Sequence, residues 1–576
     1  MNSPLLKAMV LYQVLLFAVF AGAGWSAGVP AAATPGAVER SLAPKPLPEP
    51  SRLPEMKIEE EGAPALGAAA ITFQLKSVVF AGNTIFTSEQ LQKVVAGYIG
   101  QKMEVGKLAE IADAVTAYYK EEGYFLTRAY LPPQTIKDGQ VLIRIREGRL
   151  GEIIIKGNQR YRQELLNNTL KIIREQGAVR TADVERGLLL LMDYPGLSVK
   201  ATFKPGSAPG TTDIVLEVTE GRFFDVSLDY DNFGSAFVSR NRYGASLDLN
   251  NLTGWGDSLA LHGVTGDRGF DGLFYGRVAY ALPLGYSGTK LGLNYTYLKY
   301  KLGQELSVLD AGGESNAGGV SLSYPLIRSR KVNWFLQGGF NITDVSQKIA
   351  GNTSGKDRLR FASLGTTWQY LDSLEGSNTV SLRGYRSFEK ILGGMDKGDP
   401  DTIRINSDVV YSKVELDLSR IQRLPAGFSL LLNGTGQWAG DRLPSSEEFH
   451  LGGAGTVRGY AQGERSGDKG YAVTAELRIP LLGLQDERWF GKPVGEMVQL
   501  AAFYDYGKVW ITDAAQNGEQ ALDGIDMHGA GAGLRFNYSP WMRLKVDWAK
   551  SVGGQDPLDT SDKDNGIWLV QAVLSF

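Results

Sequence analysis

Residues 542–548 read Met-Arg-Leu-Lys-Val-Asp-Trp, so apolar and polar side chains alternate along them without a break. Alternation with a period of two places successive side chains on opposite faces of a β-strand. The same pattern runs from residue 221 to residue 576, in about sixteen segments separated by turns rich in glycine, aspartate and asparagine. This length allows about 22 residues for each strand and its loop, which suits strands that span a membrane.

The alternating region needs a partner for its apolar faces. A soluble sandwich would bury these faces in a core, but no helices are expected here to cover them, and the opposite faces carry many charges. Backbone groups in lipid must all be paired, so a sheet in a membrane has to close on itself. The sequence therefore predicts a mostly β protein in which residues 221–576 form a 16-stranded antiparallel transmembrane β-barrel.

The composition excludes several classes of function. The 576 residues include no cysteine, which removes disulfides, thiolate metal sites and cysteine catalysis. The net charge of −3 gives no basic field for a nucleic-acid partner. The histidines are scattered at His262, His450 and His528, and we expect no metal site and no cofactor. The 71 glycines and the 10% of aromatic residues suit a β-barrel.

The amino-terminal 70 residues predict a signal peptide and a linker. Lys7 precedes the apolar run Val10–Phe20, and Ala21-Gly22-Ala23 follows it. A charged start, an apolar core and small residues are typical of a secretory signal peptide, which we assign to residues 1–27. Residues 28–70 are rich in alanine and proline and are predicted to be an extended linker.

Two similar units follow, at residues 71–148 and 149–220. Each is predicted to contain a strand, two helices and two further strands, with a Gly-Asn turn after the first strand, at Gly82-Asn83 and at Gly157-Asn158. A recurring turn in a recurring order of elements indicates an internal repeat. Each unit is a small α/β domain whose sheet leaves an edge that a peptide could join.

Catalytic motifs are scarce. Gly256-Asp257-Ser258-Leu259 matches the four-letter signature of one esterase family, but Ile525 stands where that family has an aspartate three residues before a histidine, here His528. Ser258 also opens an alternating segment. We therefore predict a strand start at Ser258 and a protein that is not an enzyme. The sequence contains no nucleotide-binding loop and no His-Glu-x-x-His site.

The most informative residues lie in the loop after the eleventh alternating segment and in the wall two segments later. The loop contains Val457-Arg458-Gly459-Tyr460 in a glycine-rich run that can approach other backbone closely. In Phe503-x-Asp505-x-Gly507, the period of two places the three named residues on the inner face of the barrel. An inward Asp505 and a loop Arg458 that folds inside would form a pair. The alternative is a solvated aspartate and a surface arginine.

These two motifs together resemble the outer-membrane barrel-assembly and secretion superfamily, whose sixth extracellular loop places an Arg-Gly-Tyr tip in the lumen against an aspartate of the wall. Two small units before sixteen strands are similar to the two-partner secretion transporters, relatives of the haemolysin activators and of the filamentous haemagglutinin transporter. Their units are POTRA (polypeptide-transport-associated) domains, and residues 123–134 resemble part of the first one. The resemblance covers about residues 72–576.

The resemblance implies an outer-membrane transporter of a Gram-negative bacterium, with POTRA domains 1 (71–148) and 2 (149–220) in the periplasm. These domains would recognise one large exoprotein through its amino-terminal secretion domain, and the barrel would secrete it unfolded. Other expected partners are outer-membrane lipid and, during biogenesis, the barrel-assembly machinery. The carboxyl-terminal Phe576, after a run of outward apolar residues, resembles the signal by which outer-membrane barrels are recognised for insertion.

Three other functions stay open at the level of sequence. A barrel-assembly factor of the same superfamily would insert other barrels, but such factors usually have more POTRA units. A surface esterase on a barrel would depend on Ser258. A simple porin would leave the two repeated units without a role.

Overall fold

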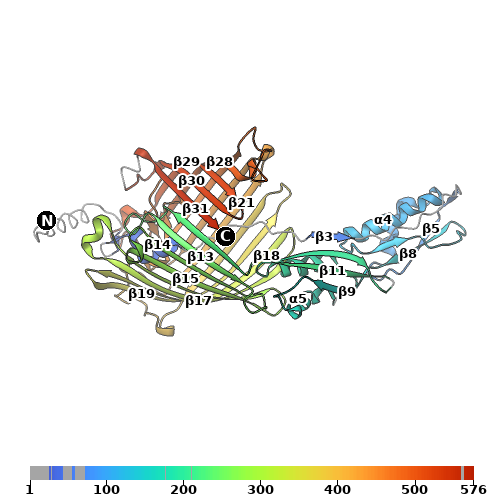
Figure 1. The fold of residues 1–576 in the computed structure, drawn as a ribbon, viewed down its shortest axis with the longest axis horizontal. Helices are drawn as coiled ribbons and strands as arrows, with labels where there is room; N and C mark the ends of the chain where they lie inside the picture. The colour runs from blue at the N-terminus through green and yellow to red at the C-terminus, as the bar shows by residue number, and fades with distance from the viewer. Residues whose placement is uncertain are drawn as a thin grey trace, which may run out of the picture.

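The computed structural model describes residues 25–26, 29–42, 55–58, 72–174, 177–208, 210–558 and 564–576. The molecule is elongated, with a large barrel at one end and two small α/β units that extend from it in a row (Figure 1). The predicted signal peptide lies outside the described residues except for β1 (Trp25–Ser26), which pairs with β2 (Val29–Pro30). Among the described residues, no helix is long and apolar enough to cross a membrane.

Sixteen strands form the barrel that the alternating pattern predicts. They are β12 (Phe224–Asp231), β13 (Arg242–Asn250), β14 (Ser258–Gly266), β15 (Leu273–Leu284), β16 (Thr289–Lys301), β17 (Gly312–Arg328), β18 (Val332–Ile349), β19 (Asn352–Leu371), β20 (Ser377–Ser387), β21 (Ser412–Arg423), β22 (Ser429–Ala439), β25 (Lys469–Pro480), β28 (Val498–Trp510), β29 (Ile525–Tyr538), β30 (Met542–Gly554) and β31 (Ile567–Ser575). Neighbours pair antiparallel, and β31 pairs with β12, so the sheet closes. Closure leaves no strand edge unpaired in lipid.

The two faces of the wall differ in burial as the alternation requires. On β28, Phe503 and Asp505 are buried, whereas Tyr504 between them is exposed. Trp548 on β30 lies opposite Trp568 on β31, and both are exposed. The buried faces therefore line the lumen and the exposed faces form the lipid-facing surface.

Connections alternate between the two ends of the barrel. The POTRA units precede β12 and lie at one end of the barrel, the periplasmic end. The turns after β13, after β15 and after every second barrel strand that follows therefore lie at this end. The opposite, extracellular end carries the longer loops 388–411, 440–468 and 511–524, which we call loops 5, 6 and 7.

The first unit contains β4 (Thr72–Gln74), β5 (Ser77–Ala81), α3 (Ser88–Val95), β6 (Lys102–Glu104), α4 (Leu108–Glu121), β7 (Arg128–Tyr130) and β8 (Gln140–Arg146). Its main sheet has the order β5-β8-β7. Apolar residues of both helices and of this sheet form a single buried core, in which Leu91, Ile111, Val141 and Ile143 have no exposed surface. The unit thus has a core of its own.

The second unit contains β9 (Arg149–Lys156), α5 (Gln163–Thr169), α6 (Lys171–Arg174), α7 (Thr181–Met192), β10 (Leu197–Pro205) and β11 (Thr211–Glu220). Its helices cover one face of a sheet with the order β3-β10-β11-β9, in which β3 (Glu55–Ile58) comes from the segment before the first unit. Both units fasten the turn at their Gly-Asn pair, which follows β5 in the first unit and β9 in the second, in the same way. Glu147 accepts hydrogen bonds from the backbone N–H of Thr84 (2.6 Å) and Ile85 (2.8 Å), and Glu220 accepts one from that of Gln159 (2.7 Å).

The second unit docks on the periplasmic turns of the barrel. Nη2 of Arg328 lies 2.7 Å from Oδ1 of Asp193, and Nε lies 3.0 Å from Oδ2. Arg186 of α7 donates to the carbonyl of Pro325 at 2.9 Å. These contacts join α7 and the residue after it to the periplasmic end of β17, so they fix the orientation of the second unit on the barrel.

The prediction of an extended linker over residues 28–70 is wrong at two places. Residues 35–42 form helix α2 (Pro35–Leu42), whose Gly36 and Val38 are buried against the barrel interior. Residues 55–58 form β3 (Glu55–Ile58), which pairs parallel with β10. A helix this short has little stability alone, and contacts distant in sequence stabilise it here. Its pattern within the alanine- and proline-rich stretch was too short to detect.

Candidate functional site

Loop 6 folds back into the barrel. Its short strands β23 (Phe449–Leu451) and β24 (Arg465–Gly467) pair with each other, and apolar side chains of the loop pack against Val509 and Met527 of the wall. The tip, Val457–Tyr460, is buried. A loop at the extracellular end of the barrel therefore contacts the inner face of strands β25, β28, β29 and β30.

The structure brings Arg458 of the tip against Asp505 of β28. Nε of Arg458 donates to Oδ2 of Asp505 at 2.7 Å, and Nη2 donates to Oδ1 at 2.9 Å. The backbone N–H of Arg458 also donates to Oδ2, at 3.1 Å. The pair is bidentate and buried, and such charge-assisted geometry is the strongest that arginine makes with a carboxylate.

Two more carboxylates surround the same guanidinium. Nη1 of Arg458 lies 2.9 Å from Oε2 of Glu476 and 3.1 Å from Oδ2 of Asp547. Arg535 balances this negative charge, since it lies 2.8 Å from Glu476 and 2.5 Å from Asp547. The carbon of the Arg458 guanidinium lies 3.3 Å from the centroid of the Phe503 ring, so the cation stacks on an aromatic face.

Small residues on the wall make room for the tip. A Cβ at Gly529 would lie 1.8 Å from the carbonyl oxygen of Arg458, and one at Gly507 would lie 2.4 Å from Leu451. Gly459 has φ +94°, and its Cβ would lie 2.6 Å from the backbone of Lys550. The close approach of loop and wall thus requires Gly459, whereas Gly507 leaves the space that the Leu451 side chain of the loop fills.

Tyr460 fastens the other side of the tip. Its hydroxyl lies 2.9 Å from the carbonyl oxygen of Gly553 and 2.8 Å from that of Gln555. Gly553 lies at the extracellular end of β30, and Gln555 follows that strand. The residue is buried, so these contacts satisfy a hydroxyl that has left water.

Sequence reasoning named Asp505 as the wall partner and missed Glu476, Asp547 and Arg535. The period of two did place Glu476 and Asp547 on the inner face of their strands. Inward charges on neighbouring strands were therefore the available signal. What the pattern could not give is the height of each residue along the barrel, which decides whether it reaches the loop.

Helix α2 occupies the lumen beside loop 6. Arg40 donates to the carbonyl of Glu448 at 2.6 Å, and Ser315 of the wall donates to Glu39 at 2.6 Å. Arg242 of the wall donates to the Ser41 carbonyl at 3.0 Å. These polar contacts join α2 both to the wall and to loop 6. None of them is part of the strand pairing that closes the barrel.

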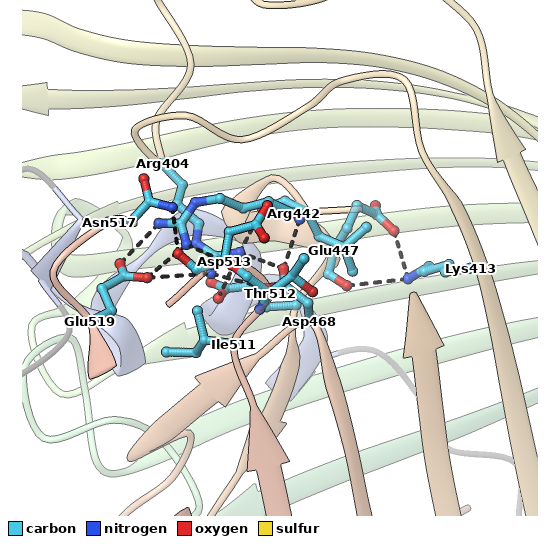
Figure 2. A network of polar contacts seen from close by, with 12 residues as sticks. Arg404, Lys413, Arg442, Glu447, Asp468, Ile511, Thr512, Asp513, Asn517 and Glu519 are labelled. Atoms are coloured by element: carbon cyan, nitrogen blue, oxygen red, sulfur yellow. Dashed lines mark hydrogen bonds and ion pairs between the residues drawn. The ribbon is translucent and has the colours of Figure 1, made fainter. Parts of the chain in front are cut away.

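A second network ties three extracellular loops together (Figure 2). Asp468, at the end of loop 6, accepts hydrogen bonds from Arg404 of loop 5 at 2.6 Å and from the backbone N–H of Thr512 of loop 7 at 2.7 Å. Arg442 of loop 6 and Glu519 of loop 7 form a bidentate pair at 2.7 and 2.9 Å. The loops are therefore joined above the lumen by buried charges.

Glu448 contributes a titratable group to these loop contacts. Burial raises its pKa to about 7, although Arg404 at 3.2 Å opposes the shift. Its proton affinity is therefore far above that of an ordinary glutamate.

The remaining sequence candidates lie apart from this site. Ser258 is the first residue of β14, and Asp257 before it accepts hydrogen bonds from Thr253 and Tyr280. Ser258 follows a periplasmic turn, whereas His528 lies near the extracellular end of β29. In the described part of the chain, no group of three or more histidine, aspartate and glutamate residues could hold a metal ion.

Phe576 lies at the seam where the barrel closes. Its backbone N–H donates to the carbonyl of Val226 at 2.8 Å, and its side chain is exposed. Together with Leu574 it belongs to the outward face of the last strand. The aromatic end of the chain is therefore accessible from the lipid side.

Comparison with known proteins gives consistent matches. Residues 210–536 match the family described as haemolysin secretion/activation protein ShlB/FhaC/HecB, and residues 73–148 match the ShlB-type POTRA domain. The chain is 25% identical over 587 residues to the heme/hemopexin transporter protein HuxB of Haemophilus influenzae (strain 86-028NP), which covers 98% of this chain and 99% of that relative.

A second relative and a solved structure point the same way. The chain is 25% identical over 522 residues to the outer membrane transporter CdiB of Escherichia coli O6:K15:H31 (strain 536 / UPEC), covering 84% of this chain and 83% of that one. The structure of CdiB from Escherichia coli aligns over 100% of this chain and 99% of its own with a TM-score of 0.69 at 21% identity, which shows a shared fold.

Proposed function

Because the chain belongs to the ShlB/FhaC/HecB family of haemolysin secretion/activation proteins, we propose that its POTRA units recognise the amino-terminal secretion domain of one large exoprotein and that its barrel secretes this exoprotein unfolded. The protein is an outer-membrane transporter of the two-partner secretion type, with its POTRA domains in the periplasm. The family consists of transporters.

The observation that carries the proposal is the way the lumen is filled. Loop 6 and helix α2 occupy it, and hydrogen bonds and ion pairs to the wall hold both of them. In the part of the chain that the structure describes, the sixteen barrel strands pair only with one another. The contents of the lumen can therefore move while the barrel stays closed toward lipid, which a channel for an unfolded polypeptide requires.

Recognition in the periplasm would use strand addition. In the first unit, the hydrogen-bonding groups on the outer edge of β7 already have a partner within the unit. The hydroxyl of Thr116 accepts from the N–H of Ala129 (3.0 Å) and donates to its carbonyl (3.5 Å). In the second unit, the outer edge of β10 accepts β3. This edge is therefore able to bind an extended segment, and β3 has to leave before an exoprotein segment pairs there.

The energy for transport would come from the passenger. The sequence contains no nucleotide-binding loop, so folding of the exoprotein outside the cell would supply direction. Loop 6 and α2 would return to the lumen after the passenger has left. The barrel-assembly machinery would insert the transporter itself, using the aromatic carboxyl terminus at Phe576.

The decisive experiment is quantitative proteomics of the culture supernatant, the cell surface and the outer membrane, with and without this gene. We expect the loss of one large secreted protein and no change in other outer-membrane barrels. A general fall in those barrels would overturn the proposal in favour of an assembly factor. No change in any fraction would contradict both functions. Re-expression of the gene is the control, and it has to restore the missing exoprotein.

A further inference from the structure

One periplasmic connection of the barrel differs from all the others. Six of them are short turns, at residues 251–257, 285–288, 329–331, 372–376, 424–428 and 539–541. The remaining connection lies between β25 and β28 and covers residues 481–497. It contains the paired strands β26 (Arg488–Trp489) and β27 (Lys492–Pro493) and the short helix α9 (Val494–Met497). We call this segment hairpin 481–497.

Hairpin 481–497 is an ordered structure. The backbone N–H of Val494 donates to the carbonyl of Glu487 at 2.7 Å, and that of Gly495 donates to the carbonyl of Gln485 at 3.1 Å. Val494 and Met497 are buried in a small apolar cluster. These contacts give the hairpin a fixed position on the barrel.

That position is on the lipid side of the wall. The same cluster includes Phe536 and Tyr538 of β29. Tyr538 pairs with Met542 of β30, which belongs to the outward face of that strand. The ring of Phe490 lies 5.3 Å from the ring of Tyr538, and the ammonium of Lys492 lies 5.5 Å from the same ring. The tip of the hairpin thus continues the lipid-facing surface at its periplasmic rim.

The tip exposes large apolar side chains beside cations. Phe490 is 77% exposed and Trp489 is 43% exposed. Arg488 and Lys492 flank the tip, next to Trp489. Aromatic residues with lysine or arginine beside them are typical of the interface between lipid tails and headgroups, where the ring enters the membrane and the cation reaches phosphate.

The backbone at the tip supports a role for Phe490. Phe490 has φ +51° and Gly491 has φ +81°, as in the two-residue turn of type I′. Asparagine before glycine is the favoured sequence there, and a bulky residue with positive φ is strained. Among the large apolar residues that the structure describes, Phe490 is the most exposed, and strain at such a residue points to a function of its side chain.

Charge along the hairpin is ordered as well. The carboxylates Asp486, Glu487 and Glu496 lie at its base and are exposed. The tip, where cations lie beside exposed rings, is suited to a surface that combines hydrocarbon with negative charge. An unfolded exoprotein in transit passes through the lumen, which lies on the other side of the wall.

We propose that hairpin 481–497 is a membrane anchor that inserts Trp489 and Phe490 into the periplasmic leaflet and binds the phosphates of anionic phospholipids through Arg488 and Lys492. The second POTRA unit docks on the turns between the second and seventh barrel strands, whereas the hairpin follows the twelfth. The second unit and the hairpin therefore contact different turns of the rim, apart from the turn at residues 539–541, where Arg222 stacks on Trp541 and Lys492 donates to the carbonyl of Ser539.

The test uses the absence of cysteine from the chain. Full-length protein with Phe490→Cys, labelled with an environment-sensitive fluorophore, is placed in vesicles of phosphatidylethanolamine and phosphatidylglycerol. We expect quenching by lipid-attached nitroxide and a several-fold lower quenching constant for aqueous iodide than at the matched control Asp486→Cys. Equal access of iodide to both positions would overturn the proposal. Protection that appears only when the exoprotein is added would overturn it in favour of a passenger-binding site.

Two variants separate the parts of the anchor. Phe490→Asn creates the favoured Asn-Gly turn, so we expect unchanged or higher thermal stability together with increased iodide access to a label at Trp489→Cys. Unchanged access would contradict the role of Phe490. In vesicles of phosphatidylcholine alone, we expect weaker protection of the label at residue 490. Equal protection there would overturn the assignment of Arg488 and Lys492 to anionic headgroups.

Discussion

Oδ2 of Asp505 accepts two hydrogen bonds from Arg458, one from Nε at 2.7 Å and one from the backbone N–H at 3.1 Å. Glu476 and Asp547 contact Arg458 through its guanidinium and not through its backbone N–H. Asp505 therefore positions the main chain of the loop tip, whereas the other two carboxylates balance its charge. This difference separates the residues of the site into two groups that can be tested.

Arg458→Ala should detach the tip of loop 6 from the wall. Among the described residues, Arg458 is the only cation within ion-pair distance of Asp505, whose side chain is fully buried. Loss of one partner of a buried pair costs about 3–5 kcal/mol. Because the strands pair without the loop, the barrel should still insert while the secreted exoprotein falls strongly, as immunoblots of supernatant and outer membrane would show.

The matched control is Arg478→Gln. Arg478 is a partly exposed wall arginine that contacts Glu476 and does not contact Asp505. It should reduce secretion far less than Arg458→Ala. Normal secretion by the Arg458 variant would contradict the role of the pair.

The sequence predicted the contact between Arg458 and Asp505 because successive side chains of a strand point to opposite faces. That period gives the direction of Asp505 once the strand is recognised, and a glycine-rich loop with one arginine offers a partner. The period gives no distances around the barrel. The alternation also turns Glu476 and Asp547 inward, but which of the many inward charges meet at one height depends on strand stagger.

Helix α2 and hairpin 481–497 could not be predicted for a different reason. Each is short, and each is held by residues far away in sequence, such as Ser315 for α2 and Tyr538 for the hairpin. Local patterns report local preferences only. Only the assembled barrel provides the surfaces on which both segments pack.

Gly36→Val should expel helix α2 from the lumen. A Cβ at Gly36 would lie 2.1 Å from the Cα of Ser446 in loop 6. Moving the backbone to relieve this overlap would cost considerable free energy. We expect higher ion conductance in planar bilayers and greater sensitivity of cells to large antibiotics, with normal amounts of folded barrel. Glu39→Gln, which keeps an acceptor for Ser315, is the control and should conduct like the parent protein. Unchanged conductance of the Gly36 variant would show that α2 does not close the pore.

Asp468→Ala should separate the three extracellular loops. Asp468 is fully buried, and its loss leaves Arg404 of loop 5 without a bidentate partner and Thr512 of loop 7 without its acceptor. Limited proteolysis of intact cells should then cut within loops 5 and 7, and mass spectrometry would locate the sites. Lys390→Gln removes an exposed pair with Asp396 and should not change the cleavage, since such pairs contribute little. Protection from proteolysis equal to that of the parent protein would contradict the role of Asp468 in holding the three loops together.

Glu220 should make the second POTRA unit sensitive to acid. Burial alone would raise the pKa of its carboxyl, but the backbone N–H groups of Gln159, Tyr161 and Arg160 and the Arg160 side chain outweigh burial and lower the pKa below 4.5. A group whose pKa is lower in the folded state stabilises that state above its unfolded pKa. The contribution is therefore complete at neutral pH and is lost as the pH falls below about 4.5.

Glu220→Gln should weaken the turn at residues 157–161 at pH 7, with faster backbone hydrogen exchange there, and should abolish the further weakening that the parent shows on acidification. The equivalent turn at residues 82–86, which Glu147 holds, serves as the internal control and should exchange at the same rate in both proteins. If the variant and the parent lose protection in parallel as the pH falls, another group is responsible for the acid sensitivity.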